Sequence, residues 1–163
     1  MNRYLIALGS NQRHARHGSP QAILRAALAD LEAQGVAVRS ASPVLRSRPL
    51  GPSQREYANG AALIETALEP LELLDLLQDG ETRFGRRRQG QRWRARTLDL
   101  DIVLWSGGGW ADDRLTVPHP EFRKRAFVLR PAVSITPGWR DPLTGLTIKH
   151  LLARLTRRAA PPR

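Results

Sequence analysis

The chain has 163 residues, no cysteine and a formal net charge of +11 at pH 7. The length fits one domain over residues 1–163, ending in a flexible tail at about residues 158–163. The lack of cysteine excludes disulfides and thiolate metal sites. The chain also has no apolar run of membrane-spanning length and no signal peptide, so we expect a cytoplasmic protein.

Apolar patterning predicts a strand at 3–9, a helix from Ser19-Pro20 to Gly35, and strands at 36–47 and 57–66. Pro43 indicates an edge or a bulge in the third of these segments. There follow an amphipathic helix at 69–85, a strand at 96–105, a hairpin at 106–110, a turn near 121–127 and a helix at 147–157. This order is an α+β, ferredoxin-like β-α-β-β-α-β arrangement with a C-terminal extension. Its antiparallel sheet is flanked by helices, which we expect on one face.

The positive charge comes almost entirely from arginine, because Lys124 and Lys149 are the only lysines. A basic surplus favours a polyanionic or phosphate-rich partner. The arginine bias could equally reflect codon composition, so where the charges cluster matters more than their sum.

The segment "RTLDLDIVLW" places two carboxylates in an apolar strand. Alternation puts Asp99 and Asp101 on one side, about 6.6 Å apart at Cα, opposite Leu98, Leu100 and Ile102. Two explanations remain open. The pair either lies on a solvated or salt-bridged face, or binds a divalent cation such as Mg²⁺, which prefers oxygen ligands.

Two basic segments flank this strand. "RFGRRRQGQRWRAR" contains seven arginines and Trp93, and "LTVPHPEFRKRAF" contains His119 and Arg125. A solvated basic loop is the simpler interpretation, but arginine binds phosphate bidentately and tryptophan stacks on planar rings. Arginines beside a carboxylate pair suit phosphoryl transfer, and neither a P-loop nor a dinucleotide fingerprint is present.

"ALGSN", "RPLGP" followed by "YANGAAL", "RWRARTLDLDIVL" and "LTVPHPEFRKRAFVLRP" together resemble the 6-hydroxymethyl-7,8-dihydropterin pyrophosphokinase family, in order from residue 4 to 155. The resemblance implies Mg²⁺-dependent transfer of pyrophosphate from ATP to the pterin hydroxymethyl group. The products are AMP and the pterin diphosphate, in folate biosynthesis. It also implies small-molecule substrates, and we expect a monomer with no specific nucleic acid and no membrane partner.

The resemblance further implies the site residues. The catalytic group is Arg86, Arg96, Asp99 and Asp101, and the two aspartates would ligate two Mg²⁺ ions. The ATP-binding group is Gln78, Glu81, Arg88, Ile102, Arg114, Thr116, His119 and Arg125. The pterin-binding group is Gly9, Ser47, Leu50, Tyr57, Asn59, Trp93 and Phe127. The sequence departs from the family pattern at Ser47-Arg48, Gln89, Arg94 and Pro120, none of which is a metal ligand.

The alternative is a basic ferredoxin-like RNA-binding module. Such modules carry aromatic side chains on the central strands, whereas "TLDLDIVLW" carries acids that repel phosphate. The enzyme is therefore the preferred hypothesis.

Overall fold

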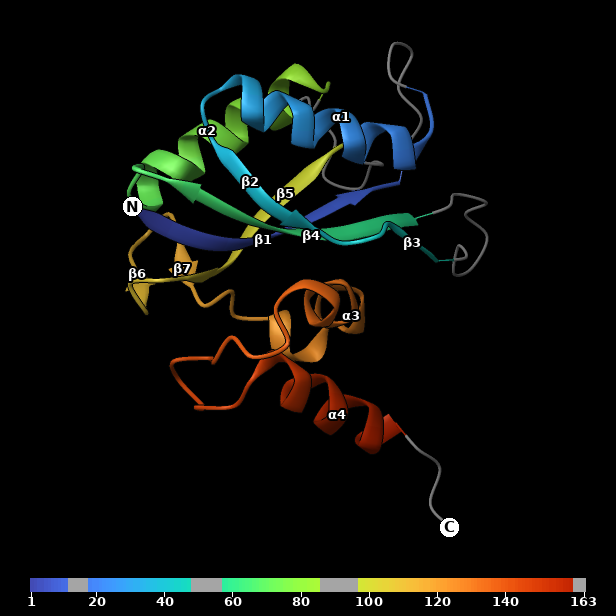
Figure 1. Cartoon of the computed structure of the whole chain (residues 1–163), viewed down its shortest axis with the longest axis vertical. Coiled ribbons are helices and arrows are strands. Elements are labelled where there is room, and N and C mark those ends of the chain that lie inside the picture. The colour runs from blue at the N-terminus through green and yellow to red at the C-terminus, as the bar shows by residue number, and fades with distance from the viewer. Residues whose placement is uncertain (12–17, 48–56, 86–96, 160–163) are drawn as a thin grey trace.

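The computed structural model describes residues 1–11, 18–47, 57–85 and 97–159 (Figure 1). Most of the expected terminal tail and several predicted loop residues lie outside these ranges. The strands are β1 (Asn2–Ser10), β2 (Ala37–Ala41), β3 (Leu45–Ser47), β4 (Tyr57–Thr66), β5 (Asp99–Trp105), β6 (Trp110–Ala111) and β7 (Thr116–Val117). The helices are α1 (Pro20–Ala33), α2 (Pro70–Arg83), the 3₁₀ turn η1 (Phe122–Lys124), α3 (Ala126–Ile135) and α4 (Ile148–Ala159).

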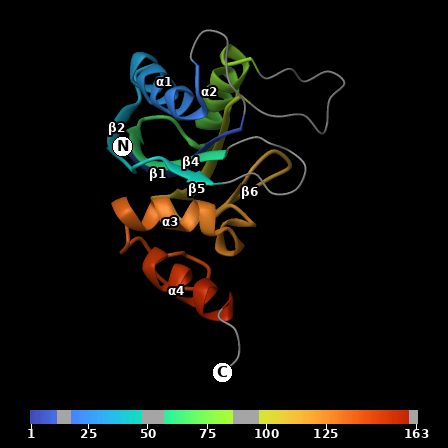
Figure 2. The same ribbon diagram turned by 90° about the vertical axis from the view of Figure 1, so that its right-hand side faces the viewer.

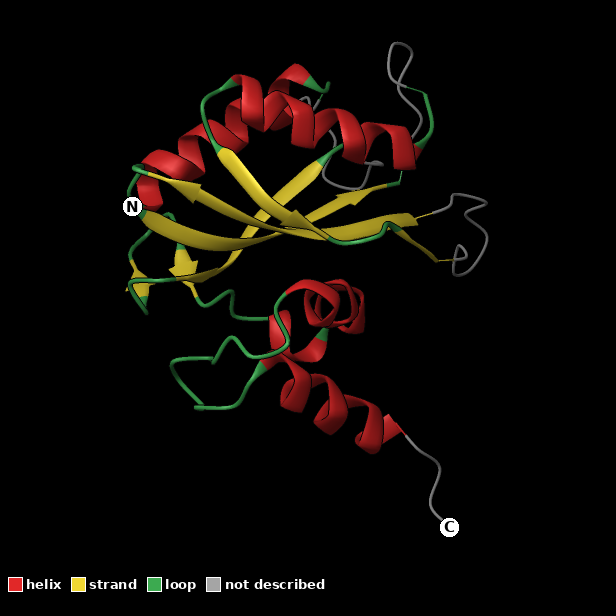
Figure 3. Cartoon of the chain, viewed as in Figure 1, coloured by secondary structure: helices red, strands yellow, loops and turns green. Residues whose placement is uncertain are grey.

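The main sheet is antiparallel, with strand order β2-β4-β1-β5 (Figure 3). Each helix of the first half returns the chain to the sheet, so that β1 lies between the later strands β4 and β5. This order confirms the ferredoxin-like prediction. The short strands β6 and β7 pair separately.

The segment 36–47, expected as one strand, is two strands that both pair with β4. Pro43 lies between them and has no backbone N–H to donate to a ladder. Ser42 maintains the pairing at the break: its backbone N–H donates to the Ala61 carbonyl, and its Oγ accepts from the Ala61 N–H, each at 2.9 Å. The predicted edge irregularity is therefore a complete interruption.

Helices cover both faces of the sheet, not one (Figures 1 and 2). Ile23 of α1 and Leu73 of α2 pack on one face against Tyr4, Ile6 and other alternate residues of the strands. On the opposite face, Leu129 of α3 and Leu151 of α4 belong to a second core with Leu5 and Val103.

The helix α3 was not predicted from the sequence, since its first residues were expected to be part of a turn. The short strand β7 was not predicted either. Pro131 lies inside α3, and proline is rarely tolerated within a helix because it lacks an N–H and crowds the preceding turn. The apolar side chains of Val128, Leu129 and Ala132 are buried against the sheet, and this packing outweighs the local preference. Within the described ranges, no helix combines the length and apolar character needed to cross a membrane.

Candidate active site

Asp99 and Asp101 lie on β5, which is at one end of the sheet order. Leu100 and Ile102, which alternate with them, are 5% and 3% exposed in the core beneath α1 and α2. The two carboxylates therefore share the opposite face, where both residues are partly exposed. This arrangement confirms that they share a side of the strand, as the alternation predicted.

One glycine, Gly9, and one asparagine, Asn59, lie next to the aspartates across the sheet. Gly9 of β1 lies opposite Asp99 and, on its other side, opposite Asn59 of β4. Neighbouring strands are about 4.7–4.9 Å apart, so Asn59 is two strand spacings from Asp99. The pairing continues outward, with Leu45 opposite Asn59 and the backbone of Ser47 opposite Tyr57.

This end of the sheet face is less covered than the remainder. Farther along the same face, Ala61 and Val103 are only 3% and 1% exposed in the core formed with α3. By contrast, Gly9, Asn59 and both aspartates are partly exposed, and Tyr57 is 38% exposed. The structure thus brings the predicted metal ligands and part of the predicted pterin set to one accessible end of the sheet.

His119 is joined to β5 through its backbone, whose N–H donates to the Val103 carbonyl at 3.0 Å. Val103 is two residues from Asp101 along that strand. The His119 Nδ1 accepts from the Glu121 N–H at 3.1 Å, which leaves the proton of a neutral ring on Nε2. His119 therefore presents a donor, which is the group that a phosphate oxygen requires.

Arg125 and Phe127 lie together where α3 begins. The Arg125 guanidinium lies over the Phe127 ring at 5.7 Å from the centroid, and Phe127 is 48% exposed. The Arg125 carbonyl accepts from the N–H groups of Val128 and Leu129, which fixes its backbone at the first turn of the helix. The geometry leaves the cation and an aromatic face partly accessible.

Glu81 and Ile102 are buried beneath the other face of the sheet, at 3% exposure each. The Glu81 Oε2 accepts from the Leu100 N–H at 2.9 Å, so this carboxylate joins α2 to β5. The Ile102 side chain packs in the core, which leaves only its backbone for a nucleotide contact. Gln78, one turn earlier on α2, is half-buried.

Arg114 reaches α2 from the connection between β6 and β7. Its Nη2 lies 2.5 Å from Asp75 Oδ1, and Asp75 is three residues before Gln78 on the helix. The hydrogen bond from Arg114 to Asp75 raises the arginine pKa, and the Arg114 backbone N–H lowers the pKa of Asp112 by donating to it. Arg114 and Gln78, which are both predicted to bind ATP, thus come from adjacent elements. Thr116 of β7, two residues after Arg114, is exposed. Asp75 was not predicted from the sequence, because an acidic residue on an exposed helix face gives no signal of its own.

The remaining predicted site residues lie outside the described part of the chain. They are Leu50, Arg86, Arg88, Trp93 and Arg96.

The donor set fits magnesium. Among the described residues, no group of three or more histidine, cysteine or acidic side chains could hold a metal. The Asp99 and Asp101 carboxylates, on one partly exposed face of β5, are oxygen donors of the kind that Mg²⁺ prefers. Mg²⁺ often binds through one or two carboxylates and completes its shell with water and phosphate oxygens.

Sequence comparison identifies the family. The family model described as 7,8-dihydro-6-hydroxymethylpterin-pyrophosphokinase matches residues 5–137. A 2-amino-4-hydroxy-6-hydroxymethyldihydropteridine pyrophosphokinase from Pseudomonas aeruginosa is 44% identical over 154 residues, covering 94% of this chain and 91% of the relative. The Synechocystis sp. protein of the same name is 41% identical over 133 residues, covering 81% of this chain and 68% of that protein.

A solved structure shows the same fold. The Plasmodium falciparum HPPK-DHPS wild-type crystal structure superimposes with a TM-score of 0.74 at 12% identity, covering 96% of this chain and 41% of that one.

Proposed function

Because the chain belongs to the 7,8-dihydro-6-hydroxymethylpterin-pyrophosphokinase family, we propose that it transfers pyrophosphate from ATP to the hydroxymethyl group of 6-hydroxymethyl-7,8-dihydropterin. The products are AMP and the pterin diphosphate, an intermediate of folate biosynthesis. The observation that supports this reaction best is the position of Asp99 and Asp101 beside Gly9 and Asn59 at the accessible end of the sheet.

The reaction exchanges one phosphorus–oxygen bond for another. The hydroxymethyl oxygen bonds to the β-phosphorus of ATP as the bond from that phosphorus to the α-phosphate oxygen breaks. The hydroxyl proton is released, and AMP leaves with the electron pair. Because little covalent work falls to the protein, its contribution is positioning and electrostatic stabilisation.

Asp99 and Asp101 are the proposed ligands of two Mg²⁺ ions. When bound, such ions neutralise charge on the phosphate oxygens. The His119 Nε2–H is proposed to donate to a phosphate oxygen, and Arg125 is proposed to supply positive charge. Arg114 would do so on exchanging its Asp75 partner for a phosphate oxygen. Arg86, Arg88 and Arg96 are also predicted, from the sequence, to contact the phosphates.

The pterin is proposed to lie against the open end of the sheet. Asn59 has both an acceptor and donors, as the amide and amine edge of the pterin requires. Tyr57 and Phe127 offer exposed ring faces, and flat rings stack on such faces. Gly9, Ser47, Leu50 and Trp93 complete the proposed slot, while Gln78, Glu81, Ile102 and Thr116 are assigned to the nucleotide side.

The proposal is tested by incubating the protein with Mg²⁺, ATP and 6-hydroxymethyl-7,8-dihydropterin and separating the nucleotides. We expect AMP to form only when the pterin is present. Reactions without pterin or with excess EDTA are the controls. Formation of ADP, or no pterin-dependent nucleotide product, contradicts the proposed reaction.

The monomeric state and the cytoplasmic location remain predictions. Light scattering on the eluted protein tests the first, and fractionation of the source cells tests the second.

A further inference from the structure

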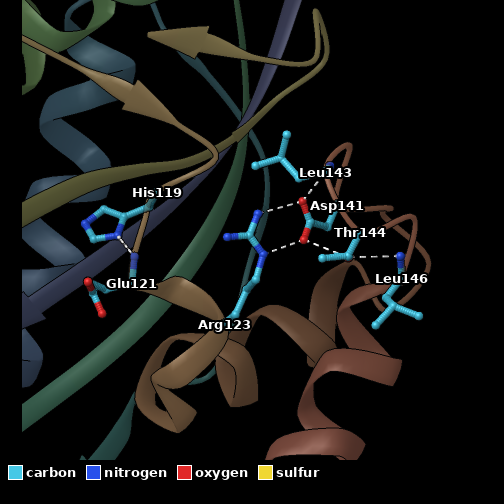
Figure 4. Close-up of polar contacts among 7 residues, drawn as sticks. All are labelled: His119, Glu121, Arg123, Asp141, Leu143, Thr144 and Leu146. Carbon is cyan, nitrogen blue, oxygen red and sulfur yellow. Dashed lines mark hydrogen bonds and ion pairs between the residues drawn. The ribbon is translucent and has the colours of Figure 1, made fainter. Parts of the chain in front are cut away.

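Asp141 is the centre of a buried polar network in the C-terminal layer (Figure 4). Its side chain is 0% exposed, and its carboxylate accepts from Arg123 Nε at 2.5 Å and Arg123 Nη2 at 2.8 Å. It also accepts from the Leu143 N–H at 3.0 Å and the Thr144 hydroxyl at 2.8 Å. Four donors therefore hold one buried carboxylate, which fixes the position of the guanidinium that it pairs with.

The backbone N–H and carbonyl of Asp141 are hydrogen-bonded as well. Its N–H donates to the Leu146 carbonyl, and its carbonyl accepts from the Gly145 N–H, each at 2.8 Å. Arg140 and Thr147 form an isolated bridge directly outside this turn. The carboxylate is thus presented from a rigid support and not from a free loop.

Arg123 belongs to η1, four residues after His119 and two residues before Arg125. The Phe122 N–H donates to the His119 carbonyl, and the Arg125 N–H donates to the Phe122 carbonyl. The Phe122 ring is 1% exposed and lies 4.7 Å from the Arg123 guanidinium. The backbone of this turn therefore connects Arg123, through Phe122, to both His119 and Arg125, the two proposed phosphate contacts.

This arrangement distinguishes the three adjacent cations of "FRKRAF". Arg123 has its guanidinium occupied by Asp141 and its side chain 24% exposed, so its charge is already compensated. Lys124 is 80% exposed and lies 4.0 Å from Glu121. Of the two arginines, Arg125, over Phe127, is the one whose guanidinium is not held by Asp141.

We infer that Asp141 is a positioning residue: through Arg123 it holds His119 and Arg125 in the geometry that the transferring phosphate group requires. The inference rests on the proposed function. A displacement of about 1 Å in a positioning group can cost about a hundredfold in rate, so the effect falls on turnover.

The test compares Asp141→Asn, Arg123→Gln and the double variant in the AMP assay, at a temperature where each is folded. We expect kcat to fall by about 10- to 100-fold in Asp141→Asn, while KM for the pterin stays within about twofold. Because both side chains act through one contact, the double variant should lose little more than either single variant. If one of these variants does not fold, Arg123→Lys, which keeps the positive charge, is measured in its place.

Leu31→Ala is the matched control, because Leu31 is 2% exposed in α1 beneath the other face of the sheet. The substitution should lower the melting temperature by leaving a cavity in the core on the other face, away from the 119–125 segment, so its kcat should remain near that of the wild type. Hydrogen exchange supplies a readout besides activity, since the amide protection of 119–125 should fall in Asp141→Asn.

A folded Asp141→Asn protein with wild-type kcat and wild-type protection of 119–125 overturns the inference. If the wild-type protein itself forms no pterin-dependent AMP, the proposed function fails. The hydrogen-exchange result then tests separately whether Asp141 holds the 119–125 segment in place.

Discussion

The Glu81 carboxylate accepts a hydrogen bond from the backbone N–H of Leu100, the residue between the two site aspartates. A buried carboxylate on α2 thus contacts the strand at the point from which Asp99 and Asp101 project to the opposite side. The family resemblance places Glu81 in the ATP-binding group. In the structure, its contact with β5 gives it a direct role in holding that strand in place.

Replacing Glu81 with alanine should destabilise the protein by about 1–3 kcal/mol, because a buried N–H loses its partner. Glu81→Gln keeps an acceptor oxygen and should cost less. Chemical denaturation of both variants measures the difference. Equal stabilities of the alanine and glutamine variants would show that this hydrogen bond is not what anchors the strand.

Asp99→Asn and Asp101→Asn should each abolish detectable turnover while the fold remains intact. Each substitution removes a proposed ligand but preserves shape and relieves repulsion between two nearby carboxylates. The melting temperature without Mg²⁺ should stay constant or rise slightly. Asp113→Asn, which alters an exposed carboxylate, is the matched control. Retention of more than about a tenth of wild-type turnover by either site variant excludes the two-metal assignment.

Gly9→Ala should weaken pterin binding with little effect on folding. A Cβ at Gly9 would lie 3.5 Å from Asn59 Oδ1, an ordinary contact, but it would project from the face that carries Asp99 and Asn59. Overpacking of a formed site costs about 1–3 kcal/mol, so we expect KM for the pterin to rise about tenfold.

Gly60→Ala provides the control for that substitution. Gly60 is on the neighbouring strand but faces the other core, where a Cβ would lie 3.5 Å from Ser42 Oγ. The contact distance is the same, yet pterin KM should not change. A similar rise in KM for both variants would point to a general effect on the sheet.

Acid should weaken the Asp141 network. Desolvation raises the pKa of Asp141, but hydrogen bonds from Arg123, Leu143 and Thr144 outweigh it and hold the pKa below its usual value. A depressed pKa contributes stability that is present above the unfolded value, about 3.9, and is lost as pH falls through the folded value.

The melting temperatures of wild type and Asp141→Asn should therefore differ most near neutral pH and converge below about pH 4. Scanning calorimetry across that range measures both. A constant difference down to about pH 3 means that Asp141 ionisation does not contribute to the stability of the wild-type protein.

Some features of this protein follow from the sequence alone. Strand alternation places Asp99 and Asp101 on one side, and the order of apolar segments predicts the ferredoxin-like arrangement that the sheet confirms. Helix α2 begins at Pro70, close to its predicted start at residue 69, because proline suits the first turn of a helix. Each of these features has a local signal in the sequence: the alternation of a strand, the order of apolar segments, or a proline at a helix start.

Other features were decided by tertiary packing. Alternation cannot say which side of β5 is covered, and the answer depends on where α1, α2 and α3 pack. The helix α3 forms around Pro131 because its apolar face is buried by distant strands. Three adjacent cations look equivalent in "FRKRAF", and Arg123 is distinguished from Arg125 by Asp141, which is 18 residues further along the chain. A charge's role depends on the partner that the fold brings to it, and that partner is not its neighbour in sequence.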